Sequence, residues 1–180
     1  MQNPSIQTFS APELIKVARA TDASEELVNN YFKMSSTHWL KNRYDIKTIK
    51  DLEMHEQLDG PFAQVIKYEG QKKDQSLGSS AFNFYKVCLQ DPAILSIVKK
   101  QKMPLEPFLL YILTHELIHV VRFSKFKQRY ENKNEADVTL EEERKVHTLT
   151  LLILNSVSIS GLNQVFDFYK DWFEKDWSYT

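Results

Sequence analysis

Two histidines and one glutamate stand close together inside the most apolar stretch of the chain. His115, Glu116 and His119 form the pattern His-Glu-x-x-His. On a helix, residues four apart share a face, so both imidazoles can reach one zinc ion at about 2.0–2.1 Å. Glu116 is offset from that pair and can lean toward an open position on the ion, where a general base for an activated water belongs. The pattern therefore predicts a zinc centre with hydrolytic chemistry.

The surroundings of this pattern favour a bound metal. Residues 108–123 carry an apolar side chain at most positions, and they are expected to form a buried helix. Ionisable groups in such a helix need partners, because an unpaired buried imidazole or carboxylate is costly. The alternative is a chance match with histidines that make ordinary hydrogen bonds, which a chain of this length shows about once in a hundred. We therefore favour the metal.

A catalytic zinc site has three protein ligands and one open position, so a third ligand is needed. Glu143 and His147 are four apart on a helix expected after Thr139, and the polar residues 127–137 can turn the chain back. One of the two should bind the metal, and the other should support a ligand histidine by hydrogen bonding. The spacing does not choose between them. The segment 134–137, expected in the loop, is a second source of a ligand. The alternatives without a metal are that Glu143 is one more solvent-exposed charge and that His147 is a polar residue at the edge of the apolar stretch that follows it.

Residues 115–119 resemble the HExxH helix of the zincin metallopeptidases, and Glu143 resembles the third ligand of the gluzincin branch. The resemblance implies that His115, His119 and Glu143 bind zinc and that Glu116 is the catalytic base. It also implies a peptide or protein substrate, bound along an edge strand of a small sheet that precedes the active-site helix. His147 departs from that branch, which commonly has an aspartate at this position.

Hydrolysis also needs a group that stabilises the negatively charged oxygen of the transition state. Tyr130, Tyr85 and His147 are the candidates, and the sequence selects none of them. Arg122 lies one turn beyond His119, where it either pairs with a carboxylate near the site or remains a surface cation.

The elements around the site are predicted to form a mainly helical α+β fold in one domain, residues 1–180. Capping boxes, helical periodicity and proline or glycine breaks predict most of the helices, and β-branched and aromatic runs predict two antiparallel strands. Two of the expected helices begin at Ser10 and at Asp22. Further helices are expected over about 46–58, 91–100, 108–123 and 139–160, and a final helix begins at residue 162. Asp91 is expected to be an N-cap, and Gly161 is expected to end the helix over 139–160. The expected strands are 62–68 and 81–89, joined by a loop over 69–80.

The composition limits the function classes. Lys and Arg number 23 against 24 Asp and Glu, which argues against a broad nucleic-acid-binding surface. Residues 108–123 are too short and too interrupted by ionisable groups to cross a membrane. The lone Cys88 fits a reducing compartment, and no secretory signal is evident, so we expect a cytoplasmic protein without membrane or nucleic-acid partners. The sequence gives no indication of oligomeric state.

Three other hypotheses compete with the peptidase. The first is a metal-binding but non-catalytic regulatory or scaffold protein, in which all four candidate ligands close the coordination shell. The second is a non-haem iron enzyme with two histidines and a carboxylate. The third is a helical interaction domain that docks a partner through the aromatic tail Phe166, Trp172, Phe173 and Trp177, although such a stripe is more often core. The isolated His38, Trp39 and His55 are expected to be structural or solvated.

Overall fold

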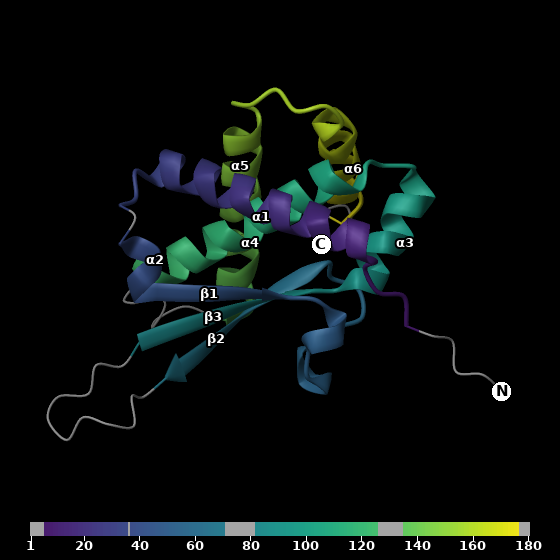
Figure 1. The fold of residues 1–180 in the computed structure, drawn as a ribbon. Helices are drawn as coiled ribbons and strands as arrows, with labels where there is room; N and C mark the ends of the chain where they lie inside the picture. The colour runs from purple at the N-terminus through teal and green to yellow at the C-terminus, as the bar shows by residue number, and fades with distance from the viewer. Residues whose placement is uncertain (1–5, 36, 71–81, 126–134, 177–180) are drawn as a thin grey trace, which may run out of the picture.

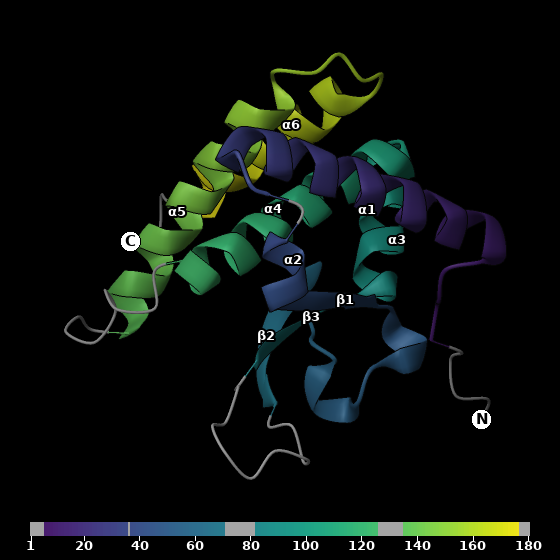
Figure 2. The ribbon, with the colours of Figure 1, turned by 60° about the vertical axis from the view of Figure 1, so that its left-hand side comes forward.

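The computed structural model describes residues 6–35, 37–70, 82–125 and 135–176. The described residues are mainly helical and include a three-stranded mixed sheet. Figures 1 and 2 show the helices gathered on one side of the sheet. This arrangement is an α+β fold, as the sequence predicts.

The first helix, α1 (Ala11–Phe32), is continuous. It begins with the predicted capping box, in which the backbone N–H of Ser10 donates to the Glu13 carboxylate at 2.7 Å. The predicted second start at Asp22 is wrong. Ser24 Oγ donates instead to the carbonyl of Ala20 at 2.6 Å, four residues earlier, so this hydroxyl bonds within the helix and does not cap a new one.

The sheet has the strand order β1-β3-β2, with β1 Asn42–Lys47, β2 Ala63–Gly70 and β3 Phe82–Leu89. β2 and β3 are antiparallel, which confirms the predicted pair. The helix predicted over 46–58 is wrong, because Ile46 lies in β1, opposite Val87 of the parallel β3. The short helix α2 (His38–Lys41) precedes β1, and two short helical turns, η1 Ile49–Asp51 and η2 Met54–Glu56, lie between β1 and β2.

Asp91 opens α3 (Asp91–Gln101) as its first residue, and Gln90 takes the N-cap position that the sequence assigns to Asp91. The Asp91 carboxylate accepts hydrogen bonds from the backbone N–H groups of Phe9 at 3.0 Å and Ile49 at 3.1 Å. One buried carboxylate therefore joins the segment before α1, the turn after β1 and the start of α3.

The central helix is α4 (Leu105–Lys125), which contains the predicted buried run. Every residue from 107 to 121 is buried, because α4 contacts α1, α3, α5, α6 and the sheet. Within the described ranges, no helix combines the length and the apolar character needed to cross a membrane.

The chain then returns along α4 as α5 (Glu135–Leu154) and continues as α6 (Leu162–Asp176). α5 begins before Thr139, so residues 135–137 are helical and not in a loop as predicted. It also ends before the predicted residue 160. Gly161 has a positive φ of 90° and lies against Pro104, so it serves the turn into α6. The predicted apolar stripe of α6 is buried at Leu162, Val165 and Tyr169. The side chains of Trp172 and Phe173, and all of Trp177, lie outside the described residues.

A fully buried carboxylate, Glu56, holds the segment before β2 onto the sheet. Its Oε1 accepts hydrogen bonds from Tyr68 Oη at 2.6 Å and from Lys86 Nζ at 2.5 Å. Its backbone carbonyl accepts from the side-chain amides of Gln64 and Gln90. The hydrogen bonds from Lys86 and Tyr68 lower the pKa of Glu56 to about 2. This cluster anchors the strand that forms one wall of the site described below.

Glu56→Gln is expected to lower the free energy of unfolding by about 2 kcal/mol at neutral pH, because it removes a charged acceptor from two short hydrogen bonds. The loss should shrink as the pH falls from 4.5 toward 2, since the carboxylate pKa is about 2 when folded, against 4.5 otherwise, and wild type loses the same stabilisation on protonation. Urea denaturation across this pH range measures both effects. The exposed Asp59→Asn is the control, and an equal effect in both variants would contradict the structural role of Glu56.

Candidate metal centre

Three side chains from α4 and α5 bring their donor atoms close together. His115 and His119 lie one turn apart on α4, and their Nε2 atoms are 3.1 Å from each other. Glu143 on α5 places Oε2 at 3.2 Å from His115 Nε2 and Oε1 at 3.1 Å from His119 Nε2. The structure therefore brings together the two histidines of the pattern and the first of the two candidates for the third ligand.

The spacing between the donor atoms of these three side chains fits a zinc ion. Ligands at about 2.0–2.1 Å in a tetrahedral shell lie about 3.3–3.4 Å apart. The two Nε2 atoms are 3.1 Å apart, and the two carboxylate oxygens of Glu143 lie 3.2 Å from His115 Nε2 and 3.1 Å from His119 Nε2, so the donors are two imidazole nitrogens and one carboxylate. These are the donor types that zinc accepts, and three of them leave a fourth position open.

The charges of the cluster also favour a cation. Burial opposes ionisation of Glu143, but the hydrogen bonds from His115 and His119 outweigh it and hold the carboxyl pKa well below its ordinary value. Burial alone would lower the pKa of His119, but the hydrogen bond with Glu143 raises it. The carboxylate thus stays ionised between two imidazoles, an arrangement in which a metal ion can replace shared protons.

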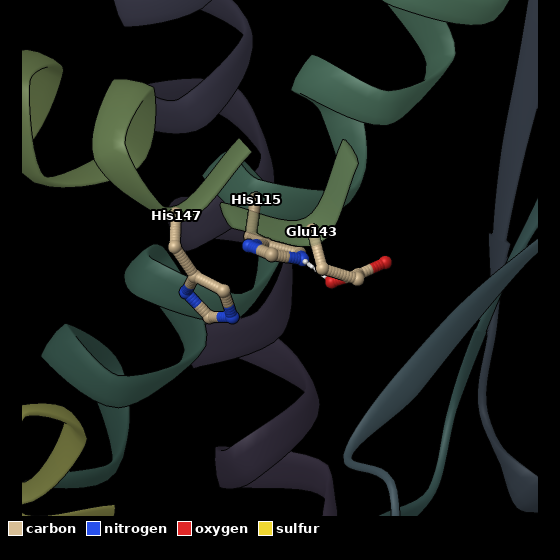
Figure 3. A group of neighbouring side chains, drawn as sticks. All are labelled: His115, Glu143 and His147. Carbon is tan, nitrogen blue, oxygen red and sulfur yellow. Dashed lines mark ion pairs between the residues drawn. The ribbon is translucent and has the colours of Figure 1, made fainter. Parts of the chain in front are cut away.

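His147 lies beside this cluster, one turn beyond Glu143 on α5 (Figure 3). Its ring centroid is 4.2 Å from that of His115, and ligand atoms of His115, Glu143 and His147 all lie within 4.8 Å of one another. These three could also hold a metal, but with a looser spacing than the first set. His147 Nδ1 is hydrogen-bonded to Tyr111 Oη at 3.0 Å. Burial, followed by the neighbouring His115, lowers the pKa of His147 to about 2.

The Nδ1 atoms of His115 and His119 are buried and have no hydrogen-bond partner among the described residues. His147 therefore makes no hydrogen bond to the Nδ1 atom of His115 or His119. The sequence predicts such a supporting bond for the one of Glu143 and His147 that does not bind the metal, and the structure does not show it for His147. Its bond to Tyr111 takes up one ring nitrogen on the side away from Glu143.

A cavity of about 540 Å³ opens in front of the cluster. Glu116 lines it and is only 8% exposed, and burial raises the pKa of its carboxyl group. The edge strand β2 contributes Ala63, Gln64 and Val65 to one wall. The remaining lining residues include Phe62, Ile112, Phe123, Tyr169, His115, His119, Glu143 and His147. The cavity thus joins the candidate metal ligands, a buried carboxyl group and a sheet edge.

Arg122 pairs with the carboxylate next to Glu143, which answers the question that the sequence left open for this residue. Both carboxylate oxygens of Glu142 accept from Arg122, with Nη2 to Oε2 at 2.8 Å. The two side chains are 16% and 8% exposed. A paired, forked contact of this kind fixes α5 against α4 at the level of Glu143.

Glu142→Gln is expected to lower the free energy of unfolding by about 3 kcal/mol, because it leaves the largely buried Arg122 without its carboxylate. Glu141→Gln on the same helix is the control. The ion pair of Glu141 with Lys145 is 51% exposed on both sides, so its loss should cost less than about 0.5 kcal/mol. Urea denaturation of both variants tests the difference, and equal losses would show that the forked pair does not fix the two helices.

The other predicted site residues lie elsewhere. Tyr85 is fully buried, its hydroxyl has no partner among the described residues, and it does not line the cavity. Tyr130 and the side chains of residues 134–137 lie outside the described part of the chain. The isolated residues lie away from the site. His38 is hydrogen-bonded to Ser124, Trp39 is hydrogen-bonded to Asn29, and His55 is exposed to solvent.

Sequence reasoning missed Tyr111. It is four residues before His115 and so shares its helix face, which is a visible signal. The residue was assigned only to the apolar run, because a tyrosine in such a run is usually part of the core. Its partner His147 is 36 residues away.

No family model, curated protein or solved structure matches this chain. The geometry of the centre and the pattern at residues 115–119 are therefore the features that indicate a function.

Proposed function

We propose that this chain is a zinc-dependent metallopeptidase with a zincin-like fold, in which His115, His119 and Glu143 hold the ion and Glu116 is the general base. The observation that carries the proposal is the set of three donor side chains, with contacts of 3.1–3.2 Å between them, at the wall of a cavity that is also lined by a buried carboxyl group. The expected cytoplasmic location belongs to the same proposal.

The zinc ion, when bound, supplies a Lewis acid that polarises a carbonyl and lowers the pKa of water toward 7. Glu116 contributes a carboxylate in a buried position, where its raised pKa brings it closer to the working pH of a general base. It accepts a proton from the attacking water at a carboxylate oxygen and then delivers it to the leaving amine nitrogen. Glu143 supplies the negative charge that two neutral imidazoles lack.

The cavity suits an extended peptide. β2 is an edge strand, and three of its residues line the cavity, so a substrate backbone can add to the sheet by main-chain hydrogen bonds. Phe62, Ile112 and Phe123 give the walls an apolar character. A peptide or protein with an apolar side chain near the cleaved bond is therefore the proposed substrate.

The test uses protein purified without added metal. Metal analysis should find about one zinc per chain, as expected for a three-ligand site. A peptide mixture should be cleaved by this protein, a chelator should stop the cleavage, and added zinc should restore it. Bound zinc without cleavage of any peptide or protein would favour the non-catalytic regulatory or scaffold alternative. Bound iron would favour the two-histidine, one-carboxylate oxygenase class.

A further inference from the structure

Tyr111 is placed to control His147. Its side chain is fully buried on α4, and its ring stacks on that of Tyr169 of α6 with centroids 4.0 Å apart and planes at 17°. The stack holds the hydroxyl where it meets His147 Nδ1 at 3.0 Å. Two helices thus fix the position of one phenol oxygen next to one imidazole nitrogen.

The direction of this hydrogen bond follows from the buried hydroxyl. Burial raises the pKa of Tyr111, so the phenol keeps its proton. Among the described residues, His147 is the one hydrogen-bond partner of that hydroxyl. If Nδ1 donated, the phenol hydrogen would be left buried without an acceptor, which costs about 1–3 kcal/mol. The tyrosine therefore donates and Nδ1 accepts.

A neutral imidazole that accepts at Nδ1 carries its hydrogen at Nε2. Such an Nε2–H has no lone pair for a metal, but it can donate a hydrogen bond. Figure 3 shows the second ring nitrogen of His147 on the side that faces Glu143, and His147 lines the cavity. The ligand atoms of His115, Glu143 and His147 lie within 4.8 Å of one another, so a donor at His147 is next to the proposed reaction centre.

We propose that His147 is a catalytic hydrogen-bond donor and not a metal ligand, and that Tyr111 is the positioning residue that fixes its tautomer. His147 Nε2–H donates to the carbonyl oxygen of the scissile bond as that oxygen becomes negatively charged. The proton stays on Nε2 throughout, so no bond to hydrogen is broken at this residue. The inference rests on the proposed peptidase function. It assigns the stabilising role for which the sequence offered three candidates.

The first test needs no activity. Nitrogen-15 NMR of the metal-free protein should show His147 protonated at Nε2, and Tyr111→Phe should shift it toward a mixture of tautomers. The exposed Tyr31→Phe of α1 is the control and should leave the spectrum unchanged. A His147 signal protonated at Nδ1 in wild type would overturn the inference, whatever the peptidase assays show.

The second test separates a donor from a ligand. His147→Ala should lower kcat by about 10²–10³-fold, as loss of one such donor does, with little change in KM. Its zinc affinity, measured against a chromophoric chelator, should stay within about threefold of wild type, whereas loss of a ligand would cost far more. His147→Gln, which keeps an N–H donor, should recover part of kcat. A tenfold or greater loss of zinc affinity in either variant would overturn the inference.

The third test examines the coupling of the two residues. Tyr111→Phe should lower kcat by about tenfold, and the double variant with His147→Ala should be no slower than His147→Ala alone, because Tyr111 acts only through His147. Additive losses would overturn its positioning role. If wild type cleaves no peptide, the proposed function and the catalytic part of this inference fail together. The NMR and zinc results then still decide between donor and ligand.

Discussion

Glu116→Gln is expected to lower kcat by about 10²–10⁴-fold while zinc remains bound. In the proposed site, the Glu116 carboxylate is the only ionisable group of the His-Glu-x-x-His pattern that does not bind the ion. A general base typically accelerates a reaction by about 10²–10⁴-fold. Glutamine keeps the shape of the side chain but cannot accept the proton from the attacking water. The effect should therefore appear in kcat and not in metal content.

The same substitution should also stabilise the folded chain slightly. Burial raises the pKa of Glu116, so at neutral pH the ionised side chain carries a desolvation cost that glutamine does not. A gain in stability together with a loss of activity is typical of a functional site. Thermal unfolding of the metal-free proteins and peptide cleavage by the metal-loaded ones check both effects.

Glu106→Gln is the matched control for this prediction, because Glu106 lies on the same helix ten residues earlier. Its ion pair with Arg19 spans 3.8 Å between side chains that are 40% and 67% exposed. This substitution should change neither kcat nor stability appreciably. If Glu116→Gln cleaves peptides as fast as wild type does, the assignment of the base and the peptidase proposal both fail.

The sequence predicts those features that depend on local spacing. The buried α4, the capping box at Ser10 and the antiparallel pair β2–β3 follow from periodicity and turn chemistry within short segments. β1 was missed because its strand character depends on the parallel β3, which is distant in sequence. A six-residue strand such as Asn42–Lys47 gives a weak local signal when its partner is far away.

The site shows the same division. The placement of His115, Glu116 and His119 on one helix needs nothing beyond the period of a helix. The choice between Glu143 and His147 depends on how α5 crosses α4, where the Arg122–Glu142 pair and the Tyr111–His147 hydrogen bond join the two helices. Neither contact is encoded in the spacing of the candidate ligands, so sequence reasoning had to leave the third ligand open.

Glu143→Gln is expected to weaken zinc binding by at least about 100-fold, because it replaces the one anionic ligand of the proposed set with a neutral amide. A ligand at 1,000 times its Kd stabilises the native state by about 4 kcal/mol, and a 100-fold weaker site keeps only about 1.4 kcal/mol of this at the same zinc concentration. For a chain of this size, 1 kcal/mol corresponds to about 2–4 °C in Tm. Zinc should therefore raise the Tm of wild type by about 8–16 °C and that of Glu143→Gln by about 3–6 °C.

Two variants on the same helix make this result specific. Glu141→Gln removes a neighbouring exposed carboxylate and should keep the full zinc-dependent rise in Tm. His147→Ala should also keep it, because in our proposal His147, hydrogen-bonded to Tyr111 through Nδ1, is a donor and not a ligand. A rise in Tm that survives in Glu143→Gln but is lost in His147→Ala would move the third ligand from the carboxylate to the imidazole. The spacing of 3.1–3.2 Å among His115, His119 and Glu143 would then reflect shared protons and not a place for the metal.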